Sequence, residues 1–80
     1  MKLSIYSLKN ILFQGLATSL NCQTAAGEIT ILDNHEAMIG VLVAGAVRIG
    51  TKGKDDQYFP IKSGFFEIKP NNEVRCIVEQ

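Results

Sequence analysis

Apolar and polar residues alternate with a period of two along most of this chain, and the alternation predicts short β-strands. Residues 3–8 alternate until Lys9-Asn10 interrupts the run, and residues 28–32 alternate until Asp33-Asn34. Because successive side chains of a strand point to opposite faces, each run can bury one side. We expect residues 16–24 to form one strand whose core-facing side is Leu16, Thr18, Leu20, Cys22 and Thr24.

Two further pairs of runs have the form of β-hairpins. The first joins Ala46–Thr51 to Gln57–Ile61 through a polar segment, and the second joins Phe65–Lys69 to Val74–Val78 through Pro70-Asn71-Asn72. Proline fixes φ and asparagine tolerates a positive φ, so the second connection is typical of a turn. Short alternating runs separated by turn residues predict an all-β sandwich or barrel of antiparallel hairpins.

The segment Met38–Ala44 differs from the other runs because it is apolar at both parities. Whichever side packs inward, the other presents apolar side chains, either Ile39, Val41 and Val43 or Met38 and Leu42. One interpretation places both sides in a two-layer core, and the other makes the outward side a docking surface for another protein. Gly40 favours the docking interpretation, since a glycine within a strand often marks the close approach of another backbone.

Length and composition restrict the classes of function. A chain of 80 residues, 46% of them hydrophobic, has room for one core, so we expect residues 1–80 to form a single domain. Eight basic and eight acidic residues give a net charge of +0, without the basic excess of a nucleic-acid-binding protein. The N-terminal segment is interrupted by Lys9 and Gln14, unlike a signal peptide. The uncharged stretch Ala37–Val47 is far shorter than the roughly 20 residues of a membrane span.

Few residues have the side chains that catalysis or metal binding requires. His35, the only histidine, lies between Asp33 and Glu36, and the two cysteines are Cys22 and Cys76. A metal site at this turn, or a cysteine–histidine nucleophile, would need partners that the sequence does not place together. We expect both cysteines to be half-buried core residues with reduced thiols. His35 has two interpretations, as a turn residue held by hydrogen bonds or as a partner contact.

The order of short motifs resembles a known family. The motifs are Leu12–Gly15, Gly27–Leu32, His35–Ile39, Gly45–Ile49, Ser63–Ile68 and Pro70–Val74. In order and spacing they are similar to the N-terminal domain of the epsilon subunit of F-type ATP synthases, and the match spans nearly the whole chain. The family usually has glycine before the histidine and proline two residues after it. Here these positions hold Asn34, which also tolerates a positive φ, and Ala37.

The resemblance implies a flattened antiparallel β-sandwich of two sheets in the central stalk, or rotor, of a proton- or sodium-translocating ATP synthase. Such a subunit is not catalytic and carries no cofactor or metal. It docks on the gamma subunit and the c-ring and so couples ion transport, hydrogen ion transport in many members, to ATP synthesis. It is peripheral, without direct membrane insertion, at the cytoplasmic face of the inner (plasma) membrane. The alternative is a generic β-sandwich protein-binding module.

The resemblance also carries over to individual residues. On the c-ring side it implies a loop formed by Ala26, Gly27 and Glu28, in which Glu28 pairs with basic residues. On the gamma side it implies a strip formed by His35, Met38, Ile39 and Gly40. This strip overlaps the segment that is apolar at both parities. Epsilon subunits commonly continue into two C-terminal helices that restrain ATP hydrolysis, and because this sequence stops at Gln80 we expect it to lack that function, either as a trimmed domain or as a naturally short form.

Overall fold

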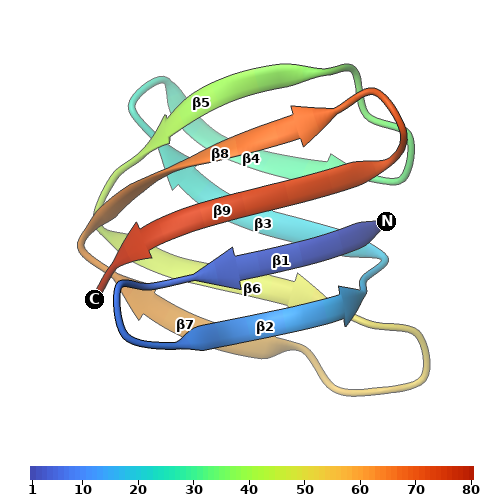
Figure 1. The fold of residues 1–80 in the computed structure, drawn as a ribbon, viewed down its shortest axis with the longest axis horizontal. Helices are drawn as coiled ribbons and strands as arrows, with labels where there is room; N and C mark the ends of the chain where they lie inside the picture. Colours follow the sequence, from blue (N-terminus) through green and yellow to red (C-terminus); the bar gives the residue numbers. More distant parts are fainter.

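The computed structural model describes all 80 residues, and every regular element in it is a β-strand (Figure 1). None of these elements is a helix that could cross a membrane. The nine strands are β1 (Lys2–Tyr6), β2 (Ile11–Leu16), β3 (Ser19–Thr24), β4 (Gly27–Leu32), β5 (Met38–Leu42), β6 (Gly45–Gly50), β7 (Gln57–Ile61), β8 (Ser63–Lys69) and β9 (Glu73–Glu79).

The strands form the two layers of a β-sandwich, as expected. Strands β2-β1-β9-β8-β5 make the front layer in Figure 1, and β4-β3-β6-β7 make the back layer. The layers join at one corner, where Leu42 of β5 pairs with Thr24 of β3 and the Val43 amide donates to the Gln23 carbonyl at 3.0 Å. The chain then turns from β5 into β6, so a single segment contributes to both layers, as at the corners of other sandwiches.

Two expectations about the strands are wrong. Residues 16–24 are not one strand, because the chain bends at Ala17-Thr18 between β2 and β3, and Leu16 is 78% exposed at the end of β2. Strand β2 was not predicted, because it is an outer strand with only partial burial and no clear alternation. The pairings are also not all antiparallel, since β1 lies parallel to β9. No local pattern reveals a pairing between opposite ends of the chain.

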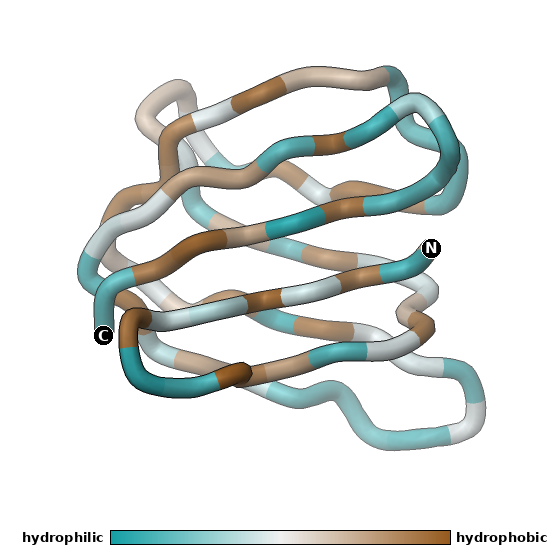
Figure 2. Tube along the Cα trace, viewed as in Figure 1, coloured by the Kyte–Doolittle hydropathy of each residue, from teal (hydrophilic) through white to brown (hydrophobic).

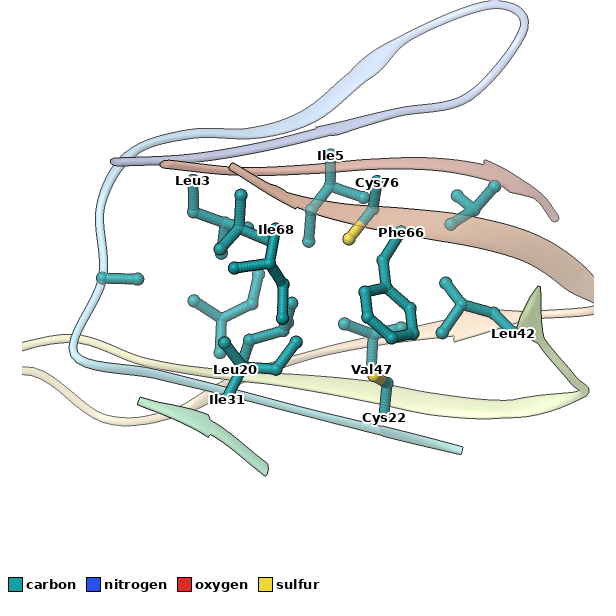
Figure 3. Packing of buried hydrophobic residues seen from close by; sticks show 14 of the residues in the cluster. Leu3, Ile5, Leu20, Cys22, Ile31, Leu42, Val47, Phe66, Ile68 and Cys76 are labelled. Atoms are coloured by element: carbon teal, nitrogen blue, oxygen red, sulfur yellow. The ribbon is translucent and has the colours of Figure 1, made fainter. Parts of the chain in front are cut away.

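The core lies between the layers and is apolar throughout. Figure 2 shows the alternation of hydropathy along the strands that places one side of each strand inward. In Figure 3, Leu3, Ile5, Phe66 and Cys76 from the front layer point toward Leu20, Cys22, Ile31 and Val47 from the back layer. Each large side chain buried in this way contributes about 1.5–3 kcal/mol to folding. Both cysteines are fully buried rather than half-buried, because they occupy inner positions of β3 and β9.

Strand β5 explains the segment that is apolar at both parities. Leu42 is buried, whereas Ile39 is 72% exposed and Val41 is 61% exposed. The interpretation that puts both sides in the core is therefore wrong, and the outward set is Ile39, Val41 and Val43. The role expected for Gly40 is also corrected, because a Cβ built there would lie 2.3 Å from a carbon of the Phe66 ring. A side chain of the same molecule, not another backbone, requires this glycine.

Candidate docking groove

An apolar groove lies at the open edge of the sandwich, where β4 ends the back layer and β5 ends the front layer. Its volume is about 460 Å³. Six of the seven residues predicted to contact partners line it, on its two sides. One side is formed by Ala26, Gly27 and Glu28, and the other by Met38, Ile39 and Gly40. The structure thus joins in one groove two sets that the sequence analysis had assigned to different partners.

The turn before β4 forms the first side of the groove. The Ala26 amide donates to the Thr24 hydroxyl at 3.2 Å, and that hydroxyl donates to the Gly27 carbonyl at 2.6 Å. Gly27 has a φ of 119°, a conformation that side chains other than glycine rarely adopt. The turn therefore holds Glu28 at the rim, where its carboxylate is exposed and accepts a long hydrogen bond of 3.5 Å from the Gln23 amide.

The second side of the groove depends on the pairing of β5 with β8. Gly40 lies directly opposite Phe66, and the Phe66 ring occupies the space in which a side chain at position 40 would lie. Phe66 is buried and forms the floor of the groove, while Ile29 of β4 packs against the core from the other side. Met38 remains 39% exposed, so the inner side of β5 leaves apolar surface open to solvent.

His35 does not line the groove. It lies half-buried in the loop before β5, and its Nδ1 is 2.9 Å from the Glu36 carbonyl oxygen. The loop is fixed by Asn34, which has the expected positive φ of 60° and donates its backbone amide to Asn72 Oδ1 at 2.7 Å. This geometry agrees with a turn residue held by hydrogen bonds, and a contact of His35 with a partner stays a prediction.

A short network anchors the same loop to the start of the chain. The Asp33 carboxylate is bonded to the ammonium group of Met1 and accepts a hydrogen bond from Asn72 Nδ2 at 3.4 Å. The hydrogen bond from the ammonium group, together with that from Asn72, lowers the pKa of Asp33 below its ordinary value. Asp33 is therefore held as a carboxylate that ties the loop before β5 to the first residue of the chain.

The residues considered for nucleophilic chemistry lie outside the groove. Burial raises the pKa of the Cys22 thiol to about 11 and that of Cys76 to about 12, where the neighbouring Cys22 adds to the effect. Raised pKa values leave both thiols protonated at neutral pH, the opposite of what an activated nucleophile requires. No cluster of three or more histidine, cysteine, aspartate or glutamate side chains is present.

Sequence reasoning missed several residues of the groove. Ile29, Val41 and Phe66 also line it. Val41 was named as an apolar position of the two-sided segment but was not assigned to a site. Phe66 could have been found only from the β5–β8 register, which sets it opposite Gly40. Ile29 shares the inward parity of Ile31 in β4, and this signal was present in the alternation of residues 28–32.

The chain is an all-β sandwich with an apolar groove at its open edge. The family model described as "ATP synthase, Delta/Epsilon chain, beta-sandwich domain" matches residues 1–80. The chain therefore belongs to this family, as the order of its motifs indicated.

Two relatives illustrate the extent of the match. The chain is 35% identical over 71 residues to the ATP synthase epsilon chain of Hydrogenovibrio crunogenus, covering 89% of this chain and 49% of the relative. It is 30% identical over 73 residues to the epsilon chain of Chlorobium limicola, covering 91% of this chain and 83% of the relative. The chain thus spans about half the length of the first relative and most of the second.

The fold also matches solved structures. A chain in the cryo-EM structure of the Euglena gracilis mitochondrial ATP synthase, comprising OSCP, F1 and c-ring, superposes with a TM-score of 0.93 at 17% identity. The match covers 100% of this chain and 51% of that one. A chain in the Tetrahymena thermophila mitochondrial ATP synthase central stalk and c-ring structure gives a TM-score of 0.86 at 15% identity, covering 100% and 63%. At these identities the likeness establishes the fold.

Proposed function

We propose that this chain is a non-catalytic subunit of the central stalk of a proton- or sodium-translocating ATP synthase. In this role it docks on the gamma subunit and the c-ring and couples ion transport to ATP synthesis, as a single peripheral domain at the cytoplasmic face of the membrane. Family membership supports the assignment to the complex. The observation that carries the docking role is the groove, which brings six of the seven expected contact residues together.

The groove has the surface properties of an adhesive contact. Its lining is mostly apolar, and Glu28 is the acidic group on its rim. Apolar contacts that exclude water supply most of the free energy of association, and a charge at the rim orients the partner. We therefore assign Met38, Ile39 and Gly40, with His35 beside them, to gamma. We assign Ala26, Gly27 and Glu28 to the c-ring, with Glu28 paired to a basic residue.

The test is co-elution of the purified chain with a cognate gamma subunit in size-exclusion chromatography at about 50 µM, well above the dissociation constant of a stable subunit contact. Ile39→Glu is expected to abolish the complex, because it places a charge in a desolvated contact. The exposure of Ile39 predicts that this variant stays folded. The matched control is Leu32→Glu, at an exposed leucine of β4, which should still bind.

Glu28→Lys separates the two partners. It should weaken capture by a detergent-solubilised c-ring, whose basic loop it would repel, while leaving the gamma complex intact. If the folded wild-type chain binds neither subunit, the family resemblance has preserved only the fold, and the generic protein-binding module becomes the better assignment. If Leu32→Glu is as damaging as Ile39→Glu, the docking surface is not at β5.

A further inference from the structure

The outer face of the front layer carries an apolar row that no other part of residues 1–80 covers. The strand registers pair Val41 with Phe65, Phe65 with Ile77, Ile77 with Tyr6, and Tyr6 with Ile11. Directly paired residues lie on the same face of a sheet, so these five side chains form a continuous line across the five strands. All except the half-buried Tyr6 are exposed. A contiguous apolar strip of this kind is uncommon on a monomer and marks a contact surface.

The β8–β9 hairpin in the middle of this face has matched residues on its two strands. Phe65 lies opposite Ile77, Glu67 opposite Arg75, and Lys69 opposite Glu73. The first pair is apolar, and each of the other two joins opposite charges. Arg75 Nη2 lies 3.0 Å from Glu67 Oε1, which confirms that the two side chains of that pair project from the same face. Each of these three cross-strand pairs, called ranks below, therefore carries one group on β8 and a complementary group on β9.

This pattern is self-complementary under one particular symmetry. A two-fold axis that runs parallel to the strands, midway between β8 and β9, exchanges the two strands between facing copies. Phe65 then lies on Ile77 of the second copy, Glu67 on its Arg75, and Lys69 on its Glu73. We infer that this face is an isologous interface between two copies of this chain, with the apolar row at its centre and the charged ranks beside it.

A second copy fits this face for three physical reasons. In the two charged ranks, every charged side chain faces one of opposite sign in the second copy. An unrelated partner would bring some like charges together. The net charge of +0 means that two copies do not repel each other at long range. Stacked sheets keep their strands within about 30° of each other, a geometry that an axis parallel to the strands provides.

The extent of the face sets the strength of the contact. The domain measures 26 × 25 × 21 Å, so a single face is smaller than the about 800 Å² per partner that a typical stable complex buries. A weak, reversible dimer is the expected result. The inference does not depend on the proposed function, but the dimer would cover Val41, which adjoins Ile39 on the outer side of β5. Self-association and docking at β5 are then mutually exclusive, and the dimer is a form of the unassembled subunit.

The test is sedimentation equilibrium of the 80-residue chain from about 5 to about 500 µM, the range in which a small interface is populated. A monomer–dimer equilibrium is expected. Phe65→Ser should weaken it at least about tenfold, because it removes the central apolar contact. The matched control is Leu32→Ser, at a similarly exposed apolar residue on the outer face of the back layer, and it should leave the equilibrium unchanged. Circular dichroism establishes that each variant is folded.

A charge exchange tests the symmetry itself. Glu67→Arg should weaken the dimer, because it places two arginines together both within a copy and between copies. The double variant Glu67→Arg/Arg75→Glu restores both contacts and should recover the wild-type equilibrium. The inference is overturned if the wild-type chain is a monomer throughout the range, if Leu32→Ser weakens association as much as Phe65→Ser, or if the double variant stays as weak as the single one. Open-ended oligomers in place of a dimer would indicate edge-to-edge strand pairing and would also overturn it.

Discussion

The two ends of one cross-strand row show why the groove at the β4–β5 edge is apolar, whereas the hollow at the other edge, beside Phe13, is lined mostly by polar residues. The row runs along the inner face of the front layer through Phe13, Ile5, Cys76, Phe66 and Gly40, in the order of the paired strands. At β2 it ends in the side chain of Phe13, which packs against the core. At β5 it ends in Gly40, which has none. The molecule fills one edge with its own aromatic ring and leaves the other open as an apolar groove.

The largest effect is expected from Phe66→Ala, which removes the aromatic ring that lies in this row next to Gly40. Phe66 is 1% exposed, and truncation of a buried phenylalanine costs about 3–5 kcal/mol, which approaches the whole stability of a small domain. Urea denaturation followed by circular dichroism measures the loss. A loss below roughly 1 kcal/mol, the scale of a surface substitution, would show that the groove floor is not part of the core.

Gly40→Ala should come next, because it adds a methyl group where the Phe66 ring now lies. The ring must move, and overpacking of this kind costs about 1–3 kcal/mol. Combining the change with Phe66→Leu makes room for the methyl group, so the double variant should lose less than the sum of the single losses. Additive losses in the double-mutant cycle would mean that the two positions do not compete for the same space.

Phe13→Ala tests the opposite edge. Phe13 is only partly buried, so its truncation should cost roughly 1 kcal/mol, well below the about 3–5 kcal/mol for a fully buried ring. Complex formation with gamma should be unchanged, because the groove lies at the other edge. Size-exclusion chromatography with gamma compares the binding of this variant directly with that of Ile39→Glu. If Phe13→Ala stays folded but no longer binds gamma, the docking surface lies at the β2 edge and not at the groove.

Asp33→Asn should give the smallest change in stability, and that change should depend on pH. The pKa of Asp33 is lowered in the folded state, so its contribution to stability is present above the unfolded pKa and is lost as the pH falls through the folded pKa. The asparagine variant should therefore be less stable than the wild type at neutral pH, and the difference should shrink on acidification. Thermal melts across that range measure it, and a difference independent of pH would contradict the assignment.

The sequence predicted the elements of this fold better than their arrangement. Alternation located most strands, and the composition of the turns placed Asn34 in its left-handed conformation. Strand β2 was not predicted, because the apolar and polar residues of this little-buried edge strand do not alternate. The parallel pairing of β1 with β9 escaped because it joins segments from opposite ends of the chain, whose partnership no local pattern encodes.

The groove shows the same division between local and non-local information. The individual residues at 26–28 and 38–40 were identified from motifs, and the outward parity of Ile39 is borne out by its exposure. That both sets border one groove depends on the corner where Leu42 meets Thr24. The position of Phe66 depends on register as well. The periodicity of one sequence predicts the strands, but it does not predict which strands pair and therefore which residues lie close together.

The parallel pair β1–β9 has a consequence for the time course of folding. Strand β1 is the first strand of residues 1–80 and pairs with the last, β9, so the pairing of β1 on its second side is completed only after every other strand exists. Contacts between such distant segments carry the largest loop-closure entropy and are characteristic of slow-folding β-proteins. During synthesis the hairpin of β1 and β2 must therefore wait, with one edge unpaired, until β9 has left the ribosome.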